Sequence, residues 1–111
     1  MTFVVHKNQW WWGRTHVIVQ GNGLGLVEVQ YDKAWISIAY IRGLEVLEPY
    51  RKSGIGTRLI QSAIDDAKEN GMQFVKLAAD KNNTWLVDWY ERLGFFKISS
   101  DENEFEMIKI L

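Results

Sequence analysis

Strand-like apolar stretches recur through the first 47 residues, and the segment 24–31 alternates between its two faces. A period of two is typical of a strand that buries one face. The predicted strands cover 2–5, 15–20, 24–31 and 34–47, the last being one long strand or two broken ones. Gly21-Asn22-Gly23 is a turn of the hairpin type. A glycine inside a strand pattern often marks a bulge, so Arg42-Gly43 is the expected bend.

Two segments in the second half repeat their apolar residues at helical spacing. The first covers 55–67, and Asn70-Gly71 after it suits a left-handed cap. The second covers 83–93 and ends at Gly94. Further strands are predicted over 73–79, 95–99 and 104–110. The order of β-meander, helix, strand, helix and hairpin predicts an α+β fold.

Length and composition narrow the class of protein. The chain has 111 residues, which predicts one domain, 1–111, and its hydrophobic content of 47% is ordinary for a globular protein. A net charge of −1 argues against a nucleic-acid partner. The absence of cysteine excludes disulfides, a thiolate nucleophile and cysteine-bound metal. No apolar run reaches membrane-spanning length and no signal-peptide pattern is present, so we expect a cytoplasmic protein without a membrane partner.

The start of the first predicted helix has the features of an anion site. Gly54 and Gly56 stand where unpaired backbone N–H groups point outward, and their lack of side chains allows close approach. Arg51, Lys52 and Arg58 lie at this end, while the acidic residues lie at the other. The helix dipole favours acidic residues at the start of a helix and basic residues at its end, so this charge order is unfavourable by itself. A phosphate bound among the cations would account for it. The alternative is a solvated helix with a tight turn.

Two ordered motifs resemble the GNAT superfamily of N-acetyltransferases. Arg51-Lys52-Ser53-Gly54-Ile55-Gly56 matches its acetyl-CoA signature, R/Q-x-x-G-x-G/A, and Leu44-Glu45-Val46-Leu47 is similar to its fourth strand. The segment 83–95 resembles its later helix, ending in Tyr-Glu-x-Leu-Gly-Phe. The resemblance runs from about Ile38 to the C-terminus and does not cover the first third well.

The resemblance implies a GNAT-like, mostly antiparallel sheet with two main helices. The usual N-terminal helix pair is expected to be missing, because only 6–14 separates the first two predicted strands. It also implies transfer of an acetyl group from acetyl-CoA to a primary amine of an unidentified small molecule or peptide. A non-catalytic acyl-CoA-binding or interaction domain is the alternative, motivated by the missing helices and by a missing base.

The resemblance further implies a donor site and a general acid. Backbone groups of the fourth strand would pair with the pantetheine arm, and one N–H would polarise the thioester carbonyl. Tyr90 would protonate the departing thiolate, although it could also be a core aromatic. Asn83 would contact the cofactor, although it could equally cap its helix. The cofactor-binding residues implied are Leu44, Glu45, Val46, Arg51, Lys52, Ser53, Gly54, Ile55, Gly56, Thr57 and Asn83.

Some members of the family place a glutamate base on the strand after the first helix. The position that corresponds here, found by counting back from Asn83, is Ala78, so this base has no counterpart. Glu28, Glu45 and Asp80 are alternatives, as is water. His6 and His16 could titrate usefully but have no metal-ligand spacing, so no metal site is predicted.

Three consecutive tryptophans, Trp10-Trp11-Trp12, lie where the helix pair would be. They could plug the core, form an aromatic platform for an acceptor ammonium, or form a homodimer surface. Successive side chains of an extended run point to opposite faces, so at least one should face away from the core. We expect this segment to border the acceptor site or a homodimer contact.

Overall fold

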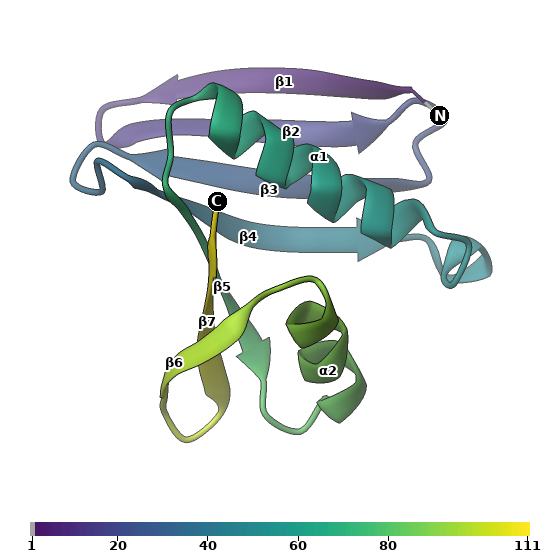
Figure 1. Ribbon diagram of the computed structural model, residues 1–111. Helices are drawn as coiled ribbons and strands as arrows, with labels where there is room; N and C mark the ends of the chain where they lie inside the picture. Colours follow the sequence, from purple (N-terminus) through teal and green to yellow (C-terminus); the bar gives the residue numbers. More distant parts are fainter. Residues whose placement is uncertain (1) are drawn as a thin grey trace.

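The chain folds in the predicted order (Figure 1). The computed structural model describes residues 2–111. Its elements are β1 (Phe3–Trp10), β2 (Gly13–Gln20), β3 (Gly25–Asp32), β4 (Ile38–Val46), a 3-10 turn (Glu48–Tyr50), α1 (Ile55–Glu69), β5 (Phe74–Asp80), α2 (Thr84–Arg92), β6 (Phe96–Ser100) and β7 (Glu104–Ile110). The main difference from the prediction is β1, which is longer and runs into the tryptophans. Neither helix within the described residues has the length and apolarity needed to cross a bilayer.

The strands form one seven-stranded sheet in the order β1-β2-β3-β4-β5-β7-β6. Every neighbouring pair is antiparallel except β4 and β5, which α1 connects in parallel. This parallel pairing is short, because only 38–40 pairs with 74–76. Beyond that point β5 turns away from β4, as Figure 1 shows. The mostly antiparallel sheet with two helices confirms the predicted fold class.

Both helices contribute to one core. Along β3 the burial alternates, so that Val27, Val29 and Tyr31 are buried while the residues between them are only partly covered. The buried positions of α1 recur at helical spacing and face these strands: Ile55, Leu59, Ile60, Ala63, Ile64 and Ala67. The expected absence of the helix pair is confirmed within the described chain, because a two-residue turn, Trp11-Trp12, joins β1 to β2. We call the sheet face turned away from this core the open face.

Strand β4 contains the predicted bulge. Gly43 pairs with Glu28 and Ile41 pairs with Val29, so Arg42 is the extra residue. A bulge bends its strand and increases the local twist. It follows closely after Tyr40, the last residue of β4 that pairs with β5.

The C-terminus of α1 is closed by the glycine that the sequence indicates. Gly71 has φ 78°, a left-handed conformation that glycine adopts without steric cost. Its N–H donates to the carbonyl of Lys68, and the N–H of Met72 donates to the carbonyl of Ala67. These two bonds define a Schellman cap, which satisfies carbonyls that the helix leaves free.

The three adjacent tryptophans do not plug the core. Trp11 is 87% exposed and Trp10 is 47% exposed, so the expectation that at least one faces away from the core is confirmed. The rings of Trp10 and Trp12 stack at 6.4 Å, and Trp10 Nε1 donates to Thr15 Oγ1 at 3.0 Å. The plug interpretation was wrong because β1 is a sheet-edge strand, with little protein to cover its end. The acceptor platform and the homodimer contact stay predictions.

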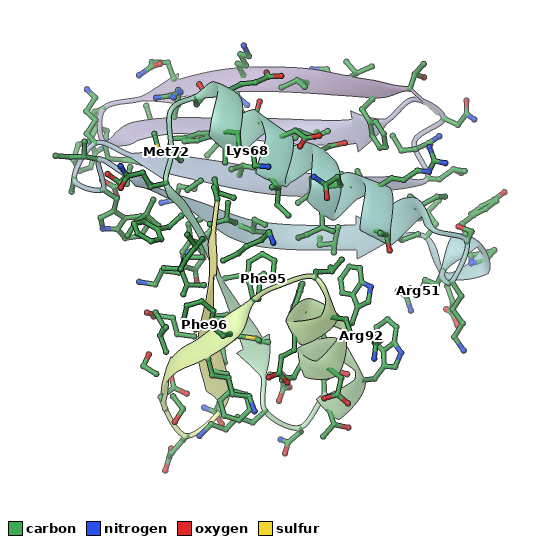
Figure 2. The ribbon with its side chains drawn as sticks, in the orientation of Figure 1. Arg51, Lys68, Met72, Arg92, Phe95 and Phe96 are labelled. Carbon is green, nitrogen blue, oxygen red and sulfur yellow. The ribbon has the colours of Figure 1, made fainter. Side chains whose placement is uncertain are left out.

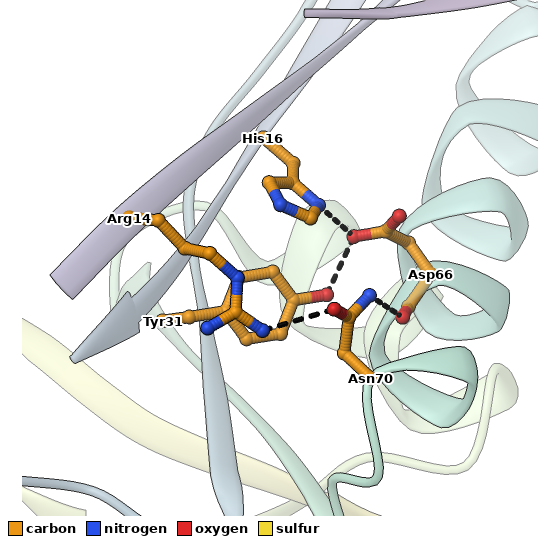
Figure 3. Close-up of polar contacts among 5 residues, drawn as sticks. All are labelled: Arg14, His16, Tyr31, Asp66 and Asn70. Atoms are coloured by element: carbon orange, nitrogen blue, oxygen red, sulfur yellow. Dashed lines mark hydrogen bonds and ion pairs between the residues drawn. The ribbon is translucent and has the colours of Figure 1, made fainter. Parts of the chain in front are cut away.

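A buried polar cluster fastens the second half of α1 to β2 and β3 (Figure 3). Asp66 Oδ2 accepts the Tyr31 hydroxyl at 2.5 Å and lies 2.7 Å from Nδ1 of His16, which is almost fully buried. The Arg14 guanidinium lies over the Tyr31 ring and donates to Asn70 Oδ1 at 2.9 Å. Asn70 in turn donates to the Asp66 carbonyl at 2.7 Å. The cluster therefore ties the sheet to the capped end of the helix.

Removing the shared acceptor of this cluster should be costly. Asp66→Ala would leave the Tyr31 hydroxyl and His16 Nδ1 without their partner in a buried site. We expect a loss of roughly 2–4 kcal/mol in the free energy of unfolding, measured by urea denaturation. Asp65→Ala is the matched control, because its side chain is exposed, and it should change stability by less than about 0.5 kcal/mol. Equal losses in both variants would contradict a specific role for the cluster.

Tyr31 should also make the fold sensitive to alkali. Burial, together with the hydrogen bond to Asp66, raises the pKa of Tyr31 above its ordinary value. The unfolded chain then loses this proton from about pH 10 upward, while the folded chain keeps it. Stability should therefore fall by up to ~1.4 kcal/mol per pH unit from this group. Urea midpoints at pH 9 and pH 11 test this, and Tyr31→Phe should show a smaller drop than the wild type.

Candidate active site

A cleft of about 450 Å³ opens where β4 leaves β5. Its walls come from the end of β4, the loop after it, the start of α1 and the exposed side of α2. Arg51 lies on that loop at the entrance to α1 (Figure 2). The lining residues are Leu44, Val46, Arg51, Lys52, Gly54, Gly56, Thr57, Trp85, Leu86 and Trp89. Seven of the residues implied as cofactor-binding are thus brought together in one cleft.

The edge of β4 presents backbone groups to this cleft. The N–H of Leu47 donates to the Leu24 carbonyl of the preceding turn at 2.9 Å. Because backbone groups alternate in direction along an antiparallel strand, those of Leu44 and Val46 point away from β3, toward the space that β5 has left. The Val46 carbonyl is held there by Arg51 Nε at 3.0 Å. A ligand with amide groups can pair with this edge as an added strand.

The two glycines of the loop have different uses. Gly54 is the N-cap of α1 with φ 87°, a conformation that other residues adopt only with strain. Gly56 is helical, and a Cβ there would lie 3.8 Å from atoms of Trp89 and Val46, both of which line the cleft. Gly54 therefore serves the backbone turn, whereas Gly56 keeps the cleft open beside the helix.

The N-terminus of α1 is uncapped and faces cations. Gly54 is the N-cap residue, and no side chain caps this helix end. The first helical hydrogen bond runs from the N–H of Arg58 to the carbonyl of Gly54, at 3.1 Å. The backbone N–H groups of the first turn are thus left for an outside partner. Arg51 and Lys52 line the cleft next to them. This combination favours an anion such as a phosphate.

Four of the implied cofactor residues do not line the cleft. Ile55 is buried in the core, and the Glu45 side chain is exposed. The Ser53 hydroxyl donates to the Tyr50 carbonyl within the loop. Asn83 Oδ1 accepts the Leu86 N–H at 3.1 Å, so this residue caps α2, as the alternative interpretation had it.

Tyr90 lies on the inner side of α2. It is 6% exposed, and its ring contacts those of Trp89 and Phe95. Burial raises the pKa of Tyr90, which keeps the hydroxyl protonated at neutral pH. Tyr90 is not among the residues that line the cleft, but its ring contacts that of Trp89, which is one of them.

The candidate bases differ in their surroundings. Asp80 Oδ1 accepts the Asn82 N–H at 2.8 Å and so belongs to the turn before α2. Glu28 is partly buried opposite Gly43, beside the bulge. Ala78 lies on β5 on the open face and is not among the residues that line the cleft.

Trp85 and Trp89 were not predicted as cleft residues. Their rings stack at 6.0 Å with an angle of 5° between planes, and Trp85 is 59% exposed. The helical spacing of the segment 83–93 places both on one face together with Leu86, Tyr90 and Leu93. Their spacing of four residues was the available signal, but it does not distinguish a core contact from a cleft wall.

Comparisons with known proteins agree on one family. Residues 5–95 match the acetyltransferase (GNAT) family. The N-acetyltransferase MJ1207 of Methanocaldococcus jannaschii, itself uncharacterized, is 36% identical over 84 residues, which are 70% of this chain and 37% of that protein. N-alpha-acetyltransferase 30 of Schizosaccharomyces pombe is 39% identical over 56 residues, 50% of this chain and 37% of that protein. This chain thus spans little more than a third of the length of these relatives.

A solved structure shares the fold. It is a Bacillus anthracis protein assigned as a streptothricin acetyltransferase and crystallised in complex with acetyl coenzyme A. The two superpose with a TM-score of 0.73 at 25% identity, over 89% of this chain and 62% of that one.

Gly56→Val tests the cleft. A Cβ at this position makes only ordinary contacts in the free protein, and valine is a better helix former than glycine, so we expect the fold to be kept and the melting temperature to change little. The branched side chain would occupy the surface that a phosphate-bearing ligand must approach, so affinity for CoA should fall roughly tenfold or more, or at least about 1.4 kcal/mol. Calorimetric titration measures this. Ser62→Ala, on the same helix outside the cleft, should bind CoA as the wild type does; an unchanged affinity in folded Gly56→Val would remove this glycine from the site.

Proposed function

Because this chain belongs to the GNAT family of acetyltransferases, we propose that it transfers an acetyl group from acetyl-CoA to a primary amine. The observation that carries the proposal is the split between β4 and β5. It places an uncapped helix N-terminus, two cations and a free strand edge along one cleft. A pyrophosphate fits the first two of these features, and an amide-bearing arm fits the third.

The donor would lie along the cleft with its pyrophosphate at the start of α1. The N–H groups of the first helical turn, together with Arg51 and Lys52, would neutralise the phosphates. The pantetheine amides would pair with Leu44 and Val46. The related Bacillus anthracis protein holds acetyl coenzyme A, which supports this choice of donor.

The chemistry needs a polarised carbonyl and a protonated leaving group. A backbone N–H of the β4 edge would donate to the thioester oxygen as negative charge develops on it. The amine attacks the carbonyl carbon, the new C–N bond forms and the C–S bond breaks. The Tyr90 hydroxyl then gives its proton to the thiolate. The proton released by the amine passes to water or to a carboxylate on the acceptor side.

A non-catalytic acyl-CoA-binding domain is the competing function. It is favoured by the absence of a carboxylate at Ala78. Incubation with acetyl-CoA and a panel of amines, with the free thiol of CoA as readout, separates the two functions. Binding of acetyl-CoA without amine-dependent thiol release would support the competing function.

Tyr90→Phe tests the proposed acid. The change keeps the ring and its contacts with Trp89 and Phe95 but removes the proton donor. We expect kcat to fall by roughly 10²–10⁴, with the affinity for CoA nearly unchanged. Tyr50→Phe is the control, because Tyr50 is exposed on the turn after β4. Wild-type turnover in Tyr90→Phe would show that Tyr90 is not the acid and only packs in the core.

A further inference from the structure

A second cavity lies on the open face, next to the point where β4 and β5 part. It has a volume of about 200 Å³. Tyr40 borders it from the last paired position of β4, where it lies beside Lys76 of β5. Ala78 alternates along β5 with buried Leu77 and Ala79, so it faces away from the core. The cavity lining comprises Tyr40, Ala78, Ser99, Ser100, Asp101, Glu104, Phe105 and Glu106.

Glu106 enters this cavity from β7. It is the direct cross-strand partner of Ala78, so both side chains lie on the same face of the sheet. The methyl side chain of Ala78 is too short to cover the carboxylate. Glu106 therefore stays accessible, with 38% of its side chain exposed.

This carboxylate already holds a primary ammonium group of the protein. Lys76 Nζ lies 2.9 Å from Glu106 Oε1. The same nitrogen lies 5.9 Å from the centre of the Trp35 ring, which packs at 5.9 Å against the ring of Tyr40. A carboxylate beside aromatic rings is an environment that binds alkylammonium ions. The Lys76 side chain thus indicates that the Glu106 carboxylate, beside the Trp35 ring, can bind an alkylammonium group.

We propose that the acceptor is a primary alkylamine whose ammonium group replaces that of Lys76 on Glu106 and against Trp35. This inference rests on the acetyl transfer proposed above, and it makes Glu106 the residue that sets acceptor specificity. The exchange is feasible because an ion pair this exposed is weak. The incoming ammonium keeps the Glu106 carboxylate paired, and the displaced Lys76 ammonium turns to solvent, where hydration stabilises it. The bound ammonium must then lose a proton to water before transfer, because only the neutral amine has the lone pair that attacks the thioester.

Steady-state kinetics with a lysine mimic tests the proposal. The probe is Nα-acetyl-lysine methylamide, whose side chain copies that of Lys76, with acetyl-CoA as donor. Glu106→Gln should raise the KM for the probe roughly tenfold or more, while the KM for acetyl-CoA stays the same. Lys76→Met removes the competing ammonium and should lower the probe KM several-fold. Glu102→Gln, an exposed change in the turn between β6 and β7, should alter neither constant.

A binding measurement without donor separates this inference from the proposed function. The probe is titrated into the protein while the indole N–H resonance of Trp35 is followed by NMR. A shift in the wild type that Glu106→Gln abolishes supports the site, even if no acetyl transfer occurs. Unchanged probe affinity and KM in both Glu106→Gln and Lys76→Met would overturn it. Acetylation of Lys76 itself, detected by mass spectrometry, would also overturn it, because Lys76 would then be the acceptor rather than its placeholder.

Discussion

The separation of β4 from β5 after three paired residues is the constraint on which the site depends. If β4 were paired with β5 along its whole length, the N–H and C=O groups on that side of β4 would all be hydrogen-bonded to β5. No strand edge would then be left for a ligand. The bulge at Arg42 comes directly after the paired segment and bends β4 where the separation begins. Helix α2 then packs beside β5 and supplies the far wall of the gap through Leu86 and Trp89. The cleft is therefore a consequence of strand geometry, and side chains only line it.

Helix α1 divides its two ends between binding and stability. Its N-terminus has neither a capping side chain nor acidic residues in the first turn, so its N–H groups are free for an anion. Its C-terminal half has a Schellman cap and the cluster around Asp66. The uncapped end contributes little to the stability of the helix, because its N–H groups have no partner in the chain. The contacts at the other end therefore hold the helix, and with it the uncapped end, in position. The polar contacts of Arg14, Tyr31 and Asn70 would support the proposed donor site in this indirect way.

The sequence was sufficient for those features that local periodicity and turn chemistry determine. These include the strand and helix order, the bulge at Arg42-Gly43, the cap at Gly71 and the glycine-rich start of α1. It was insufficient where a contact depends on which elements meet. Trp85 and Trp89 have the spacing of core residues, and only the parting of β4 from β5 makes them cleft walls. The pairing of Lys76 with Glu106 joins residues thirty positions apart, through a β5–β7 register that no local pattern encodes.

The missing helix pair changes where specificity can come from. Within the described chain no helix lies over the open face, so in the proposed transfer side chains of the sheet itself would distinguish one amine from another. On this face, beside the parting of the two strands, the pairing of Ala78 with Glu106 puts a carboxylate on β7 where β5 has only a methyl group. Trp35, in the loop before β4, brings an aromatic ring against the ammonium that this carboxylate holds. In the proposed acceptor site, one charge and one ring would thus replace the walls of a deeper pocket and leave the bound amine open to solvent.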